Sequence, residues 1–175
     1  IPSSKNFYDC VDKTRLTADE NIYVDTCYEE DIYVGYRYFT TFRKKVAYPF
    51  GYGLSYTTFA YSDIHLSSTE MSADGELTAT VTVTNTGSRD GAEVVQLYIR
   101  DLVGSVTRPV KELKGFEKIF LKAGESRKVS FSITPELLKF YNYDLQFVCE
   151  PGDFDAMISG NSRDVKKARF LLKGE

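Results

Sequence analysis

Apolar and polar side chains alternate along the middle of the chain with a period of two residues. In LTATVTVT, residues 77–84, apolar residues at odd positions alternate with threonines at even positions. Such alternation places the apolar side chains on one face of a β-strand and the threonines on the other. A second strand is predicted in EVVQLYIR, residues 93–100, and a third in RKVSFSIT, residues 127–134. The pattern therefore predicts strands with one buried face.

Turn-forming stretches separate these strands. NTGSRDG, residues 85–91, contains residues that tolerate left-handed backbone. We predict a bulge at Gly115, a strand start or sheet edge at Pro109, and one helical turn in TPELL that begins after Thr134. Further strands are expected near residues 140–141, 145–149, 154–159 and 168–173. Short strands at roughly ten-residue spacing, without a long helical pattern, predict an all-β two-sheet sandwich.

Antibody domains carry a Cys…Trp…Cys pattern, which is absent from this chain because it has no tryptophan. A fibronectin type III-like (immunoglobulin-like) sandwich is therefore the better prediction for residues 64–175. Residues 1–63 lack this regular alternation and are predicted to form an aromatic-rich, mostly irregular N-terminal extension. One orderly piece, EDIYVGYRYF at residues 30–39, predicts a strand whose alternate residues from Ile32 to Tyr38 share a face.

Aromatic side chains are concentrated in this extension. Fourteen of the 25 phenylalanines and tyrosines lie at or before Phe59. Each buried ring removes roughly 150–250 Å² from water. A short irregular segment cannot bury that area by itself, so it is expected to lie against the sandwich, against a missing domain, or against both. Exposed rings of this kind also leave homo-oligomerisation open.

The stretch YPFGYGLSYTTF, residues 48–59, holds five aromatic residues and two glycines. It lacks the third glycine and the Gly-Lys-Ser/Thr of nucleotide-binding loops, so a tight path beneath aromatic neighbours is the better interpretation. No cofactor is predicted. The residues predicted to pack between domains are Tyr36, Arg37, Tyr38, Phe39, Pro49, Phe50, Gly51, Tyr52, Gly53 and Tyr56.

Charge and cysteine content exclude several kinds of partner. The net charge of −3 leaves no positive excess for nucleic acid, and no apolar run is long enough to span a membrane. Cys10, Cys27 and Cys149 fit neither a zinc site nor a disulfide framework. Reduced thiols, together with the absence of an N-glycosylation sequon and of a signal-peptide pattern, predict a cytoplasmic location for this piece.

Candidate catalytic groups are few. His65 is the single histidine and lies on a predicted strand, where a structural or solvent-facing role is expected. Metal-binding motifs are absent, and we predict no metal site. Two carboxylates can hydrolyse a glycosidic bond, and the candidates are the run Glu29–Asp31 and the pair Asp153 and Asp155. The pair is expected on the solvent face of a strand, so no catalytic residue is predicted here.

Five motifs occur in an order that resembles the C-terminal portion of family 3 glycoside hydrolases, the β-glucosidase type. They are EEDIYVGYRYF (29–39), YPFGYGLSYTTF (48–59), VTNTGSRDGAEVVQLYI (83–99), RPVKELKGFEKIFLKAGES (108–126) and LLKFYN (137–142). The resemblance implies a longer enzyme with a barrel domain, an α/β sandwich domain and a fibronectin type III-like domain. Residues 1–63 would then be the tail of the α/β domain plus the linker, and residues 64–175 the last domain.

The motifs that carry the nucleophile and the acid/base in this family are absent from the chain. The resemblance therefore implies a non-catalytic accessory domain that braces the catalytic domains of a retaining β-glycosidase, with carbohydrate as the substrate of the whole enzyme. The loop Asp101–Arg108 is a candidate to reach a neighbouring domain or subunit. Two alternatives stay open: a carbohydrate-binding module and a stand-alone immunoglobulin-like scaffold domain.

Overall fold

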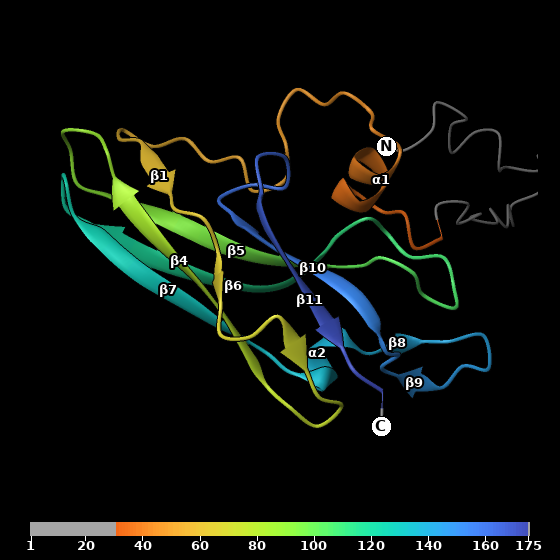
Figure 1. The fold of residues 1–175 in the computed structure, drawn as a ribbon. Helices are drawn as coiled ribbons and strands as arrows, with labels where there is room; N and C mark the ends of the chain where they lie inside the picture. Colours follow the sequence, from red (N-terminus) through yellow and green to blue (C-terminus); the bar gives the residue numbers. More distant parts are fainter. Residues whose placement is uncertain (1–30, 175) are drawn as a thin grey trace, which may run out of the picture.

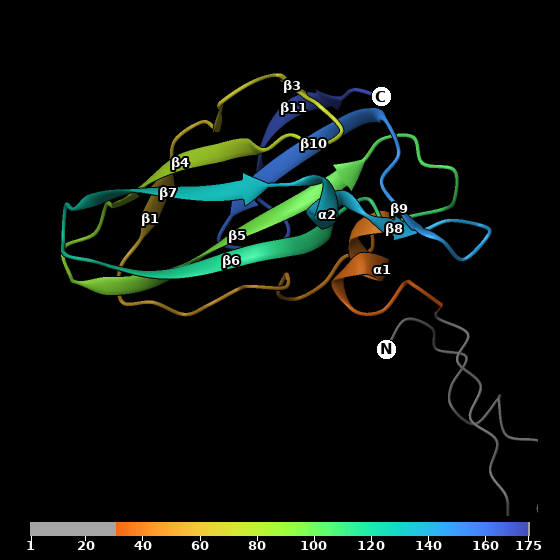
Figure 2. The same ribbon diagram turned by 90° about the horizontal axis from the view of Figure 1, so that it is seen from below.

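The computed structural model describes residues 31–174. Two β-sheets pack face to face in a sandwich, as Figures 1 and 2 show from two directions. The predicted all-β, fibronectin type III-like fold is confirmed. Neither helix within these residues has the length and apolar character required to cross a membrane.

Sheet A is built around one long central strand. Strand β4 (Leu77–Asn85) pairs with β7 (Ser126–Ile133) along one edge and with β1 (Phe59–Tyr61) and β2 (His65–Leu66) along the other. Every second residue of β4 is buried and the intervening threonines are partly exposed, as the period of two predicts. β1 precedes the predicted boundary at residue 64, so sheet A includes residues that the sequence assigns to the extension.

Sheet B contains five strands, in the order β3, β11, β10, β5, β6. Their bounds are β3 (Glu70–Met71), β11 (Lys166–Leu172), β10 (Gly152–Ser159), β5 (Gly91–Asp101) and β6 (Glu112–Leu121). The register of β5 with β6 shifts between Leu97, which lies opposite Gly115, and Tyr98, which lies opposite Leu113. This shift confirms the bulge predicted at Gly115.

The core lies between the two sheets. One cluster of buried side chains includes Val81 and Val83 of β4 together with Val95 and Leu97 of β5, and all four are at most 1% exposed. On β10 and β11, the rings of Phe154 and Phe170 stack with centroids 5.5 Å apart. The sandwich therefore holds a continuous apolar core of its own, and the rings of Phe59 and Tyr61 from the N-terminal extension pack against it.

Two short helices and a hairpin complete the fold. α2 (Pro135–Leu138) begins after Thr134 and confirms the predicted helical turn. β8 (Phe140–Tyr141) and β9 (Phe147–Val148) form a separate hairpin. Figures 1 and 2 both place this hairpin, the loop between β5 and β6, and the helix α1 at one end of the sandwich, which we call the α1 end.

The strand predicted at residues 30–39 is wrong for the part that the structure describes. α1 (Tyr36–Thr41) replaces it, and it begins after Gly35, whose φ is +59°. This left-handed conformation suits glycine and breaks an extended chain. Inside the helix, the Thr40 hydroxyl donates to the carbonyl of Tyr36. Tertiary packing of one helical face, described below, overrides the alternation in the sequence.

Candidate interdomain surface

Residues 31–58, which we call the lead-in, cross the outer face of sheet B. α1 is attached there through Tyr36, whose ring stacks on Phe50 with centroids 4.8 Å apart and meets Tyr98 edge-on at 5.8 Å. The Tyr36 hydroxyl also accepts a hydrogen bond of 2.8 Å from the backbone N–H of Leu113. As a result Tyr98 is fully buried even though it lies on the outer face of the sheet.

The stretch after α1 is held by backbone contacts. The Ser162 N–H donates to the carbonyl of Phe50 at 2.8 Å. Gly51 has φ +83°, and a Cβ at this position would fall 2.3 Å from Nε2 of Gln96. Nε2 of Gln96 itself donates to the Gly160 carbonyl at 2.9 Å, while its Oε1 accepts from the Tyr98 hydroxyl. Gly51 is thus required for close approach to a side chain that is already fixed.

The far end of the lead-in is fixed by a buried amide. Thr57 Oγ1 donates to Oδ1 of Asn85 at 2.5 Å, and Nδ2 of Asn85 donates to the carbonyls of Arg89 at 2.8 Å and Leu121 at 3.2 Å. Asn85 is completely buried and belongs to the predicted turn NTGSRDG. The lead-in is therefore attached to the sandwich at both of its ends.

Four members of the predicted packing set make specific contacts with the sandwich. Tyr36, Phe50 and Gly51 do, through the contacts above, and Arg37 does through an ion pair described below. Tyr38 contacts Phe39 and Phe42, and Tyr48 contacts Tyr52. The exposed aromatic side chains of the lead-in, with their exposed fractions, are Phe42 (49%), Tyr48 (68%), Phe50 (47%), Tyr52 (52%) and Tyr56 (91%).

Gly53 differs from the prediction made for it. A Cβ at residue 53 would meet no atom within 4 Å, and the backbone there is not left-handed. The tight path is therefore enforced at Gly51 within this chain, and Gly53 faces open space. The interdomain role of the ten residues remains a prediction, and the exposed rings and Gly53 are the members that the sandwich leaves available to a further partner.

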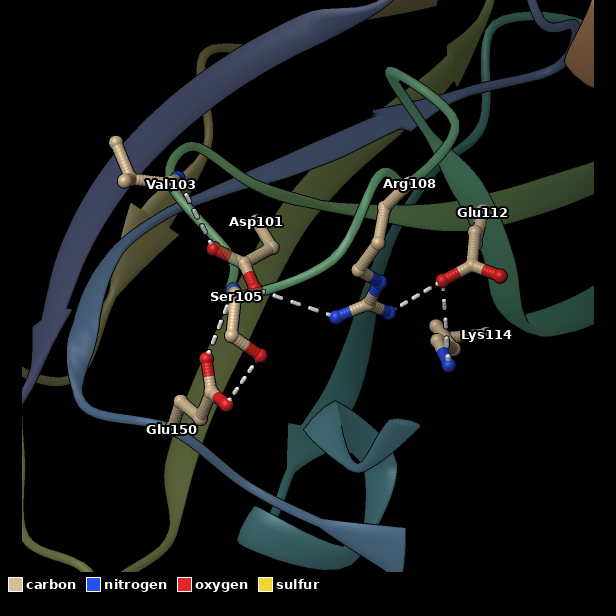
Figure 3. Close-up of polar contacts among 7 residues, drawn as sticks. All are labelled: Asp101, Val103, Ser105, Arg108, Glu112, Lys114 and Glu150. Carbon is tan, nitrogen blue, oxygen red and sulfur yellow. Dashed lines mark hydrogen bonds and ion pairs between the residues drawn. The ribbon is translucent and has the colours of Figure 1, made fainter. Parts of the chain in front are cut away.

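A charged cluster lies at the base of the β5–β6 loop (Figure 3) and is linked to α1 through Arg37. Nη1 of Arg108 lies 3.3 Å from Oδ2 of Asp101, and its Nη2 lies 2.5 Å from Oε2 of Glu112. The guanidinium also lies 4.5 Å from the centre of the Phe140 ring, a cation–π contact. Arg37 of α1 reaches Glu112 at 3.7 Å. Arg108 is 12% exposed and Glu112 18%, so the centre of this cluster is mostly shielded from water, whereas Arg37 at its edge is 40% exposed.

The charges in this cluster set the ionisation of Glu112. Burial alone would raise the pKa of its carboxyl, but Lys114, Arg108 and Arg37 together bring that pKa below its ordinary value. Glu112 is therefore ionised at neutral pH and links one cation from α1 to two from the sandwich.

The β5–β6 loop itself is held in a defined shape. Ser105 donates twice to Glu150, from its N–H at 3.0 Å and from Oγ at 2.6 Å, and the Val103 N–H donates to Asp101 at 3.2 Å. Figure 3 shows the Val103 side chain pointing away from the cluster, and it is 84% exposed. The predicted reach of this loop to a neighbouring domain or subunit remains a prediction.

A pocket of about 620 Å³ opens between α1 and the following residues. Lys111 and Ser162 line it and are both buried, at 7% and 4% exposure. Nζ of Lys111 donates to the Ser162 carbonyl at 2.8 Å. The remaining described lining residues include four aromatic rings and four further cations: Tyr36, Phe39, Tyr48, Phe50, Arg43, Lys44, Lys45 and Arg163. Lys111 was not among the predicted residues, although its motif RPVKELKG was singled out.

The carboxylates considered for catalysis are not assembled into a site. Asp155 was expected on the solvent face, and that expectation is wrong, because its side chain is 1% exposed beneath Arg169 at 3.0 Å and Lys167 at 3.4 Å. It is committed to a structural ion pair across β10 and β11. Asp153 is exposed, Asp31 is exposed, and Glu29 and Glu30 lie outside the described residues.

The remaining candidates behave as ordinary residues. His65 lies exposed on β2, in agreement with the solvent-facing role expected for it. Cys149 is a half-buried free thiol whose pKa is raised by burial and by Asp101, and the other two cysteines lie outside the described residues. Among residues 31–174, no group of three or more potential metal ligands is brought together.

Comparison with known proteins shows which proteins this chain is similar to. A family model described as "Fibronectin type III-like domain" matches residues 93–162, which run from β5 through β10. A putative β-xylosidase of Formosa agariphila is 57% identical over 126 residues, which are 72% of this chain and 17% of that protein. A periplasmic β-glucosidase of Salmonella typhimurium is 56% identical over 125 residues, 71% of this chain and 16% of that protein.

The chain belongs to the C-terminal fibronectin type III-like region of family 3 glycoside hydrolases. Solved structures agree. The β-glucosidase 3B of Thermotoga neapolitana in complex with α-D-glucose superposes with a TM-score of 0.75 at 42% identity, over 83% of this chain and 20% of that one. The β-glucosidase of Listeria innocua in complex with glucose gives a TM-score of 0.71 at 40% identity, over 75% and 18%.

This fibronectin type III-like region spans less than a fifth of the curated relatives it matches. Such a share fits an accessory domain rather than a whole enzyme. The relatives carry names for two different sugars, xylose and glucose. The location predicted from the cysteines is untested and remains a prediction.

Proposed function

We propose that this region is a non-catalytic accessory domain of a retaining β-glycosidase of the β-glucosidase type, an enzyme that hydrolyses terminal O-glycosyl bonds. It braces the catalytic portion of the same enzyme, which is its main partner. The observation that carries the proposal is the lead-in. Tyr36 and Gly51 attach it to sheet B, and Thr57 attaches it to Asn85 of sheet A. Four of its other rings, those of Phe42, Tyr48, Tyr52 and Tyr56, are 49–91% exposed.

Aromatic rings exposed at this density are expected to be buried against a partner surface. Tyr56 is 91% exposed and Leu54 92%, so the sandwich leaves both side chains almost entirely uncovered. Large apolar patches on a folded domain mark protein interfaces. Because the lead-in precedes the sandwich in sequence, a domain that precedes it in the relatives would meet this surface first. The rings therefore support docking of the catalytic portion against the outer side of the lead-in.

The chemistry of the whole enzyme would come from residues outside this chain. Retaining hydrolysis needs two carboxylates about 5 Å apart, one as nucleophile and one as acid/base. Within the described residues, the most buried carboxylate considered, Asp155, is neutralised by Arg169 and Lys167. The region is thus suited to support rather than to hydrolysis.

An aryl β-glucoside assay tests the proposal. The 175-residue chain and the longer native protein that carries it should be compared at equal molar concentration. We expect turnover by the longer protein and none above background by the chain alone. Comparable turnover by both would overturn the proposal. An aryl β-xyloside should be assayed in parallel, because relatives are named for both sugars.

A further inference from the structure

The pocket beside α1 has a charge pattern that the sandwich does not use. Its described lining residues include five cations, namely Arg43, Lys44, Lys45, Lys111 and Arg163, and none of its described lining residues is acidic. Two carboxylates elsewhere in the described residues show the opposite situation: the buried Asp155 is paired with two cations, and the partly buried Glu112 with three. The pocket therefore stands out as a concentration of positive charge without an acidic counterpart in its own walls.

Lys111 is the buried member of this group. It is 7% exposed, and its ammonium donates to one neutral acceptor, the Ser162 carbonyl. Burial and then the neighbouring Arg100 lower the pKa of Lys111, while Asp164 acts in the opposite direction. A buried ammonium with a single carbonyl partner retains two unused donor hydrogens, and burying a charge is costly unless it is paired.

Apolar groups line the same pocket as Lys111. They are the rings of Tyr36, Phe39 and Phe50 and the pyrrolidine of Pro49, and Gly35, the residue before α1, lines it as well. An occupant that fits must carry a carboxylate on a short apolar stem. Aspartate and glutamate side chains have this form, and an ion pair with an ammonium inside a ring-lined pocket is shielded from water and salt.

We propose that this pocket receives an acidic side chain from the catalytic portion of the same enzyme, which pairs with Lys111 and fixes the position of the lead-in. The proposal rests on the function proposed above. The occupant is assigned to that portion for two reasons. Gly35, near the start of the lead-in, lines the pocket, and the five cations that line it complement an acidic side chain. In the relatives, the matched region is the C-terminal part of a much longer chain.

Thermal unfolding of paired variants tests this assignment. Lys111→Met should be made in the 175-residue chain and in the longer native protein, with Lys122→Met as the matched control, because Lys122 is exposed on a turn. In the chain alone we expect little change in Tm, since the variant exchanges a buried charge for an apolar side chain of similar length. In the longer protein we expect a loss of several degrees, because an acidic side chain is left buried without its partner.

Lys122→Met should leave both proteins unchanged. An equal change in Tm for Lys111→Met in the two proteins would overturn the proposal, and so would failure of the chain alone to fold, because Lys111 would then serve the sandwich itself. Failure of only the longer variant to fold is the extreme form of the expected difference. The aryl glycoside assay separates the two ideas: a longer protein that hydrolyses but shows equal Tm changes refutes the Lys111 pairing and leaves the accessory function intact.

Discussion

Gly51 lies directly against the side-chain amide of Gln96, in the middle of the outer face of sheet B. A Cβ at residue 51 would come within 2.3 Å of Nε2 and 2.8 Å of Oε1 of that amide. The amide cannot retreat easily, because it is bonded to the Gly160 carbonyl and to the Tyr98 hydroxyl. This contact fixes the path of the lead-in between α1 and β1, and it separates the roles of two glycines that look equivalent in the sequence.

Gly51→Val is expected to destabilise the 175-residue chain. A β-branched residue at φ +83° carries backbone strain of about 1–3 kcal/mol, and the clash with Gln96 adds to it. Gly53→Val should change the free energy of unfolding by about 0.5 kcal/mol or less, because open space surrounds that position. Urea unfolding of the two variants provides the comparison. Equal losses would contradict the assignment of the tight approach to residue 51.

Gly53→Val should destabilise the longer protein, although it has little effect on the 175-residue chain. If the exposed side of the lead-in is covered by the catalytic portion, a valine at residue 53 disturbs that contact and lowers Tm in the longer protein while it leaves the chain alone unaffected. The measurement is thermal unfolding of both forms of the variant. A loss of the same size in the two forms would show that residue 53 serves the sandwich instead.

Tyr36→Phe is expected to loosen α1 from sheet B. The variant removes the acceptor for the Leu113 N–H and costs about 1 kcal/mol, the usual net value of one hydrogen bond. Amide hydrogen exchange gives a local readout, and Leu113 should lose protection. Tyr38→Phe is the matched control, since the described contacts of Tyr38 are with the rings of Phe39 and Phe42. Unchanged protection of Leu113 in the Tyr36 variant would refute the attachment.

Glu93 should make the sandwich less stable as pH rises. Burial raises the pKa of its carboxyl above the ordinary value of 4.5, although the Val94 amide and the Tyr61 hydroxyl act in the opposite direction. The folded chain therefore holds this proton more tightly than the unfolded chain does. The resulting stability is present below pH 4.5 and is lost as pH rises through the raised pKa.

Glu93→Gln should remove this loss of stability at high pH, because a glutamine side chain does not ionise. The variant should have a higher Tm than the parent at pH 7, and the difference should shrink as pH falls toward 4, where the parent carboxyl is protonated. Tm measured across this range checks the sign. Glu117→Gln serves as the control, because Glu117 is exposed on β6 and should leave the profile unchanged. A Glu93 variant that is less stable than the parent at pH 7 would show that the charged carboxylate is favourable.

The sandwich could be predicted from the sequence because its signals are local. Alternation in β4, the bulge at Gly115 and the helical turn after Thr134 each depend on a few neighbouring residues, and all three are present. The helix α1 could not be predicted in this way. Its sequence alternates like a strand, and the helix depends on Gly35 in a left-handed conformation and on contacts of Tyr36 with residues more than sixty positions away.

The sequence predicted where the candidate surface lies, but not which of its side chains face the sandwich. Aromatic density located the lead-in, but it could not show that Tyr36 and Phe50 face the sandwich while Tyr52 and Tyr56 face outward. The burial of Lys111 also depends on the path of the lead-in over sheet B. These facts are set by long-range packing, for which the spacing of residues carries no signal.

The exposed rings give the most direct test of bracing. The double variant Tyr52→Ser, Tyr56→Ser should leave the Tm of the 175-residue chain unchanged, because these side chains are 52% and 91% exposed in it. In the longer native protein, the same double variant should lower both the unfolding temperature and the half-life of aryl β-glucosidase activity on heating. An unchanged thermal half-life of the longer protein would contradict the account, because the lead-in would then brace nothing.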